Sequence, residues 1–341
     1  MTVADKRELI KNTLAECADT PNFAQAATKL LNILGYESPD ALDMSAEKFT
    51  ESAKDFIKQY PSMTNTPAGT KSEKELTKAV KSIRIVFEYG EQEFQPGLLD
   101  LNAYSSSHDF VFVAVELKDE NYSRSKYVAL AREINKRILR LTVVLFRAGA
   151  SLTMAFFDRR LHKKDKDRDV LQKVSLLSNI GCRDPHTGHL DILAELSLNE
   201  RIAWMNKERK PKNIDGLRIA WLDALNVDVL NKRFYCKLLA WFNLAGNVIK
   251  FPEKLRPKSD EWRIRLITRM LFIWFIKENK LVANELFNEA DIKSILKGFD
   301  GENGDSYYRA VLQNLFFAVL NTPISERKFI SETDHDFYRY H

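Results

Sequence analysis

A glutamate and a lysine, separated by one leucine, close a short apolar run in the first half of the chain. The run begins at Asp109 and ends in Glu116-Leu117-Lys118. Because alternate side chains of a strand share one face, we expect Glu116 and Lys118 to point the same way and Leu117 to point into the core. A carboxylate that holds Mg²⁺ beside a lysine that orients water or neutralises phosphate charge suits metal-dependent phosphodiester hydrolysis. Asp100, with Asp109 behind it, is the candidate for the second magnesium-binding carboxylate.

The segments around this motif predict a mixed sheet with a helix packed on it. Short apolar runs alternate with segments of helical periodicity, which is typical of a sheet covered by helices. The expected order is a helix over 73–82, strands over 83–89, 98–104 and 110–118, a helix over 126–140, and strands over 142–147 and 152–157.

This order resembles the core of restriction-type nucleases of the PD-(D/E)xK class. In that core a hairpin carries an aspartate and then a Glu-x-Lys, and a helix and another strand follow. The resemblance implies that Asp100, Glu116 and Lys118 are catalytic and that Asp100 and Glu116 bind Mg²⁺. The proline usual beside the aspartate is absent, and Glu-x-Lys is a common tripeptide. The alternative is therefore an ordinary solvated pair on an edge strand.

Helical segments flank the predicted sheet on both sides. Apolar residues fall at helical spacing before residue 60 and again after residue 200, and residues 61–70 have the composition of a linker. We therefore expect an α+β chain with three parts: an N-terminal helical segment over 1–70, a restriction-nuclease-like α/β domain over 71–200, and a helical domain over 201–341.

The composition is that of an ordinary globular protein with a mild excess of positive charge. The 341 residues are 45% hydrophobic and 29% charged, with a net charge of +5, which permits a nucleic-acid partner without requiring one. Three scattered cysteines argue against a disulfide framework. The N-terminus lacks the apolar core of a signal peptide, and the apolar run 270–276 is too short to cross a bilayer. We expect a cytoplasmic protein without a membrane partner.

Two groups of basic residues are candidates for contact with DNA phosphates. Arg124 and Arg132 share one face of the helix that follows the Glu-x-Lys strand. A second group follows the strand that ends near residue 157 and consists of Arg159, Arg160, Lys163 and Lys164. The alternatives are a solvated helix face with internal Glu–Arg pairs and a solvated loop.

The last third of the chain is rich in aromatic residues. Bases of nucleic acids stack on exposed aromatic rings, but most of these residues lie at helical spacing and are predicted to be core, among them Trp221, Trp241, Phe272, Trp274 and Phe317. Cys182, His186 and His189 lie close together, but structural zinc requires four ligands. A structural role around Pro185 is the better interpretation.

Several phrases in a fixed order resemble the N-terminal half of bacterial type IIG restriction–modification proteins. These are single chains that fuse an endonuclease-like region to an adenine-specific DNA methyltransferase. The resemblance runs from about residue 80 to the end, through Val115-Glu-Leu-Lys118, Tyr122-Ser-Arg124, Leu145-Phe-Arg-Ala-Gly149, Leu230-Asn-Lys-Arg-Phe-Tyr235 and Ala310-Val-Leu-Gln-Asn-Leu-Phe-Phe317.

The resemblance implies a part in restriction–modification and phage defence. The chain would bind double-stranded DNA and cleave it with Mg²⁺, as a type II restriction endonuclease does. The family's Asn-Pro-Pro-Tyr motif and glycine-rich cofactor loop are absent, so neither methylation nor S-adenosylmethionine binding is expected, and the chain resembles a fragment or a split subunit. The alternative is a catalytically inactive DNA-recognition or scaffold module that docks a methyltransferase domain or subunit.

Overall fold

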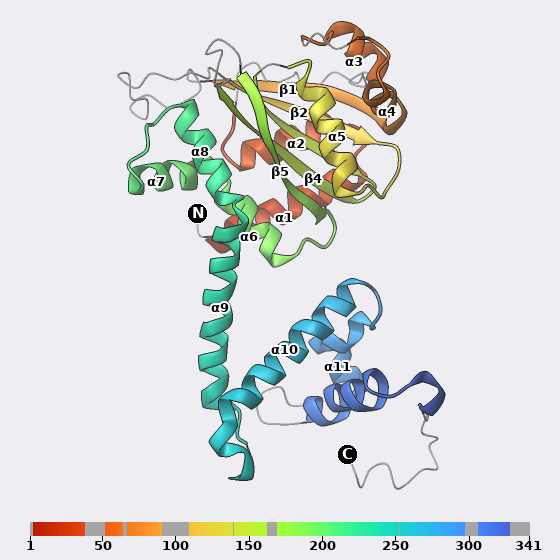
Figure 1. Ribbon diagram of the computed structural model, residues 1–341, viewed down its shortest axis with the longest axis vertical. Helices are drawn as coiled ribbons and strands as arrows, with labels where there is room; N and C mark the ends of the chain where they lie inside the picture. Colours follow the sequence, from red (N-terminus) through yellow and green to blue (C-terminus); the bar gives the residue numbers. More distant parts are fainter. Residues whose placement is uncertain are drawn as a thin grey trace. The chain divides into compact units, whose positions relative to one another are not determined.

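The computed structural model describes residues 3–37, 52–63, 67–90, 109–138, 140–161, 169–251, 253–296 and 306–327. The chain forms two compact units, Met1–Phe234 and Tyr235–His341. We call them unit 1 and unit 2 (Figure 1). The predicted α+β class is confirmed, because unit 1 contains a mixed sheet packed between helices.

The sheet of unit 1 has five strands in the order β1-β2-β3-β4-β5. Their bounds are Val80–Gly90, Asp109–Leu117, Leu141–Ala148, Ser151–Leu161 and Asp169–Gly181. Only the central pair, β2 and β3, is parallel; the other neighbours are antiparallel. A parallel pair requires a crossover, and the helix α5, Arg124–Asn135, provides it.

Both faces of the sheet are covered, and the strand alternation divides the apolar side chains into two cores. Along β2, Phe110, Phe112 and Ala114 belong to one core, and Val111 and Val113 belong to the other. The first core includes α1 (Val3–Asp19), α2 (Phe23–Ile33), α6 (Thr187–Glu195), α7 (Leu198–Lys207) and α8 (Ile214–Ala224). The second includes α3 (Ala53–Gln59), α4 (Lys71–Ala79) and α5.

Short polar side chains fix the starts of the helices that cover the sheet. Asn22, Ser52, Thr70 and Ser123 each precede a helix, and each side chain accepts a hydrogen bond from a backbone N–H of the first turn. Such caps satisfy backbone donors that have no partner within the helix. Ser123 therefore sets where α5 begins relative to the end of β2.

The first core unites segments far apart in the sequence. The Tyr36 hydroxyl donates to the Leu196 carbonyl at 2.6 Å and accepts from Trp221 Nε1 at 2.6 Å. The boundaries predicted at residues 70 and 200 therefore do not separate compact units. The helices α1 and α2 bury their apolar faces on the same side of the sheet as α7 and α8, and the division falls at residue 234.

Unit 2 contains the end of α9 and a short series of helices. The elements are α9 (Val227–Val248), η2 (Glu253–Lys258), α10 (Ser259–Glu278), η3 (Asn284–Phe287), α11 (Glu289–Ile295), η4 (Tyr308–Leu320) and η5 (Ile324–Glu326). Its core is small, with Ile273, Leu312, Leu315 and Phe316 buried together. No described helix is long and apolar enough to cross a membrane.

Several predicted elements differ in extent from those observed. The helix predicted over 126–140 spans Arg124–Asn135, and β5 was not predicted as a strand. Because β4 continues to Leu161, Arg159 and Arg160 lie in a strand rather than in a loop. The strand predicted over 98–104 lies outside the described residues.

The prediction that the C-terminal aromatic residues form a core is largely wrong. Trp221 is buried, but the prediction fails in unit 2, where its members Trp241, Phe272, Trp274 and Phe317 are exposed. Helical spacing identifies an apolar face, and it does not identify what covers that face. The apolar run over 270–276 is exposed in the same way, because within it only Ile273 and Ile276 are buried.

Candidate functional site

Glu116 lies near the end of β2, in register with Ser82 of β1 and Arg147 of β3. It belongs to the face of the sheet that α1 and α2 cover, and it is only 8% exposed. A carboxylate this deep in a protein must be paired or hydrogen-bonded, since an isolated buried charge is very costly. Its partners therefore determine what it can do.

Both carboxylate oxygens of Glu116 already have partners on neighbouring strands. Oε1 lies 2.8 Å from Lys81 Nζ and 2.7 Å from Arg147 Nη2. Oε2 accepts a hydrogen bond from the Ser82 hydroxyl at 3.3 Å. The carboxylate is thus compensated by two cations of the chain itself.

Arg147 connects this pair to the N-terminal helices. Its Nη1 donates to the carbonyl oxygens of Cys17, at 3.0 Å, and Thr20, at 2.7 Å, at the end of α1. Its guanidinium also lies over the ring of Phe23 in α2, 5.1 Å from the ring centre. Sequence reasoning missed Arg147. The available signal was a lone arginine in an apolar strand, next to a predicted strand that carries a lone glutamate.

These contacts determine the protonation of Glu116. Burial by itself would raise the pKa of the Glu116 carboxyl, but hydrogen bonds and positive charge from Lys81 and Arg147 outweigh it. The net result is a pKa below the usual range, so Glu116 is ionised at neutral pH.

Lys118 does not share the environment of Glu116. Strand β2 ends at Leu117, and Lys118 is exposed beyond that end. Its backbone N–H donates to Ala79 at 2.9 Å, and its Nζ reaches the Thr77 carbonyl of α4 at 3.5 Å. Within the described residues the Lys118 ammonium makes no contact with the Glu116 carboxylate. The two side chains therefore have different partners in the structure: the Glu116 carboxylate pairs with Lys81 and Arg147, and the Lys118 ammonium reaches the Thr77 carbonyl.

The second predicted carboxylate, Asp100, lies outside the described residues. The residues that flank the segment carrying it, Gly90 and Asp109, pair at one end of the β1–β2 hairpin. Glu116 lies seven residues beyond Asp109 along β2, so the two residues are about 23 Å apart at ~3.3 Å per residue. Ser82 takes the position opposite Glu116 on β1. Among the described residues no group of three or more histidine, cysteine, aspartate or glutamate side chains could hold a metal ion.

The predicted DNA-contacting residues are only partly described. Arg124 and Arg132 are both exposed on α5. Arg159 and Arg160 pair through their backbones with Leu171 and Val170 of β5, and the positions of their side chains are not described. Lys163 and Lys164 lie outside the described residues.

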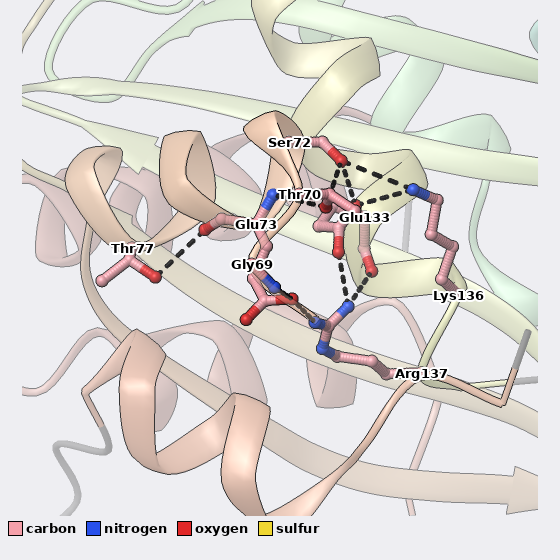
Figure 2. A network of polar contacts seen from close by, with 8 residues as sticks. All are labelled: Gly69, Thr70, Ser72, Glu73, Thr77, Glu133, Lys136 and Arg137. Atoms are coloured by element: carbon pink, nitrogen blue, oxygen red, sulfur yellow. Dashed lines mark hydrogen bonds and ion pairs between the residues drawn. The ribbon is translucent and has the colours of Figure 1, made fainter. Parts of the chain in front are cut away.

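A buried polar network holds α5 against α4 (Figure 2). Glu133 and Arg137, each 2% exposed, are four residues apart and are joined by an Nη1–Oε1 contact of 2.6 Å. The other Glu133 oxygen accepts from Ser72 at 2.7 Å and Lys136 at 2.9 Å, and Arg137 Nη2 lies 3.4 Å from Glu73. The internal Glu–Arg pairing considered for this helix is therefore present, and it fixes the helix that carries Arg124 and Arg132.

Comparison with known proteins does not identify a relative. Neither a protein-family model nor a curated protein nor a solved structure matches the chain. The function proposed below is therefore based on the geometry around Glu116 and on the resemblance of the sequence to type IIG restriction–modification proteins.

Replacing Glu116 by glutamine should destabilise unit 1. The substitution leaves Arg147 buried without its counter-charge, and we expect the free energy of unfolding at pH 7 to fall by about 3 kcal/mol. The folded-state pKa is depressed, so the stabilisation is complete above the unfolded value of about 4.3 and is lost as pH falls through the folded value. Urea unfolding from pH 7 to pH 3 should show a steeper loss for the wild type than for Glu116→Gln.

The matched control is Glu88→Gln, which removes a carboxylate from an exposed pair with Arg140. Its free energy of unfolding should remain within about 1 kcal/mol of the wild type. A Glu116→Gln variant as stable as the wild type at pH 7 would contradict the structural role of Glu116.

The Glu133–Arg137 pair should show strong thermodynamic coupling. Arg137→Met leaves Glu133 buried with less compensation and should cost about 3–5 kcal/mol, whereas the double variant Glu133→Leu/Arg137→Met should cost clearly less than the sum of the two single variants. A double-mutant cycle by urea unfolding measures this coupling. The exposed pair Lys293–Glu289, also four residues apart, provides the reference cycle and should show much weaker coupling. Additive single variants at 133 and 137 would contradict a shared network.

Proposed function

We propose that this chain is a noncatalytic module of a restriction–modification type phage-defence system, which binds double-stranded DNA and docks a methyltransferase in the cytoplasm. The observation that carries the proposal is the pairing of Glu116 with Lys81 and Arg147. The carboxylate that a nuclease would use for Mg²⁺ is instead part of the packing between sheet and helices.

Magnesium binding at Glu116 would meet two obstacles. Mg²⁺ requires near-octahedral oxygen ligands and usually keeps several waters, and Glu116 lies under α1 and α2 with both oxygens engaged. A divalent cation would also approach the charges of Lys81 and Arg147, which repel it. Displacing Arg147 would break its hydrogen bonds to Cys17 and Thr20 as well.

The exposed arginines of α5 support the DNA-binding part of the proposal. Arg124 and Arg132 project from a helix that the Glu133–Arg137 network holds in place. Arginines on a rigid element can meet successive phosphates of one strand, which gives affinity without sequence specificity.

The exposed apolar side chains of unit 2 support the docking part. In unit 1 the described large apolar side chains that are exposed are Leu9, Met63 and Phe234, whereas such side chains are frequent in unit 2. Two stripes at helical spacing stand out: Trp241, Leu244 and Val248 on α9, and Ile264, Leu271 and Phe275 on α10. Apolar surface of this extent is typical of a protein–protein interface.

The second candidate function is a Mg²⁺-dependent nuclease that uses Asp100, Glu116 and Lys118. The chain order favours it, because the hairpin β1–β2, the helix α5 and the parallel strand β3 follow one another as in the PD-(D/E)xK core. This candidate requires Asp100 to reach Glu116, and it requires Arg147 to release the carboxylate.

Cleavage of supercoiled plasmid separates the two functions. With Mg²⁺ or Mn²⁺ we expect no metal-dependent nicking by the wild type or by Lys118→Ala, because Lys81, Ser82 and Arg147 engage the Glu116 carboxylate. Duplex binding should persist and weaken as salt rises. Arg124→Ala/Arg132→Ala should lower duplex affinity, while the control Arg183→Ala, an exposed arginine paired with Asp19, should not.

Two outcomes would contradict the proposal. Nicking by the wild type that Lys118→Ala abolishes would establish the nuclease. Duplex affinity that neither salt nor the α5 double variant changes would remove DNA binding through α5.

A further inference from the structure

A groove of about 430 Å³ lies in unit 2 between α10 and η4. Polar and apolar side chains both line it. Those that matter here are Thr268, Arg269, Phe272, Phe316, Phe317 and Asn321. No carboxylate is among the described residues that line it, so its only charge is that of Arg269.

Arg269 is held by aromatic rings rather than by an acid. Its guanidinium lies 5.6 Å from the ring centre of Phe316 and 5.5 Å from that of Phe317. Among the described residues it forms no ion pair with a carboxylate. Its five N–H donors can therefore meet an anionic group that enters the groove, and a guanidinium binds phosphate in a bidentate manner.

The aromatic rings of the groove differ in exposure. Phe316 is 8% exposed and forms part of the core of unit 2, whereas Phe272 is 55% exposed and Phe317 is 46% exposed. The groove therefore offers two exposed aromatic side chains, Phe272 and Phe317, and the Arg269 guanidinium lies over the ring of Phe317. Asn321, also exposed, adds an amide that can both donate and accept hydrogen bonds.

The segment that leads into the groove has an excess of positive charge. Residues 235–269 contain eight lysines and arginines (Lys237, Lys250, Lys254, Arg256, Lys258, Arg263, Arg265, Arg269) and three acids (Glu253, Asp260, Glu261). A polymer with one negative charge per repeating unit would be attracted along this segment.

We propose that the groove binds an unpaired nucleotide of a single-stranded nucleic acid. The base stacks on Phe272 and Phe317, its phosphate pairs with Arg269, and the Asn321 amide contacts the base edge. Aromatic platforms combined with arginine and a basic track are the general means of binding single strands. An acidic peptide would satisfy Arg269, but without aromatic side chains it would leave the exposed Phe272 and Phe317 without a partner. The proposal is independent of the duplex contacts proposed for α5 in unit 1.

The test is fluorescence anisotropy of the full chain with a labelled 15-nucleotide oligothymidine at physiological salt. Arg269→Ala and Phe317→Ala should each raise Kd about tenfold. The control Lys293→Ala removes a positive charge from α11 of the same unit, where the ammonium pairs with Glu289 outside the groove and outside the basic segment 235–269. Its Kd should change by no more than about twofold.

A second probe makes the test independent of how the variants fold. An abasic 15-mer carries the same phosphates without bases, and the wild type should bind it at least about fivefold more weakly than oligothymidine.

Thermal unfolding of Arg269→Ala, and the charge-retaining variant Arg269→Lys, distinguish loss of the site from loss of the fold. Arg269→Lys should lose less affinity than Arg269→Ala.

Four results would overturn the proposal. These are no binding of oligothymidine, equal affinity for the abasic strand, equal losses for Lys293→Ala and Arg269→Ala, and displacement of oligothymidine by an acidic phenylalanine-containing peptide that binds more tightly. The last result would make the groove a peptide site.

Discussion

The architecture of unit 1 depends on one buried ion pair, Glu116 with Arg147. The pair joins the two parallel strands at the centre of the sheet, and Arg147 extends it to the carbonyl oxygens of Cys17 and Thr20. A buried pair adds little net stability over an apolar pair, but removing one partner is costly because the other charge remains. In the structure both oxygens of this carboxylate are engaged by groups of the chain itself.

Much of the fold could be predicted from the sequence, because local signals specify it. The apolar run that forms β2, the helical periodicity of α5 and the glycine turn between β3 and β4 all lie within short windows. The capping serine Ser123 is a further local signal. The extent of unit 1 could not be predicted, because it depends on the contact of Tyr36 with Trp221, which are 185 residues apart.

The candidate site was predicted less well, for a physical reason. Strand alternation predicts that Glu116 and Lys118 share a face, but it does not predict their contacts: the Glu116 carboxylate pairs with Lys81, and the Lys118 ammonium reaches the Thr77 carbonyl. Alternation also does not predict the register between strands, and it is the register that places Arg147 of β3 opposite Glu116. In unit 2, helical spacing indicated apolar faces correctly, but the small core covers only part of them. Which residues cover an apolar face depends on tertiary packing, and the spacing of residues along the sequence does not reveal it.

A crystal structure of the chain grown with Mn²⁺, with anomalous difference density calculated around Glu116, would show directly whether this carboxylate binds metal. We expect no manganese peak at the Glu116 carboxylate, and we expect Arg147 to remain paired with it. A manganese ion bound to Glu116, with Arg147 displaced and a second carboxylate completing the site, would contradict the account and establish a metal centre.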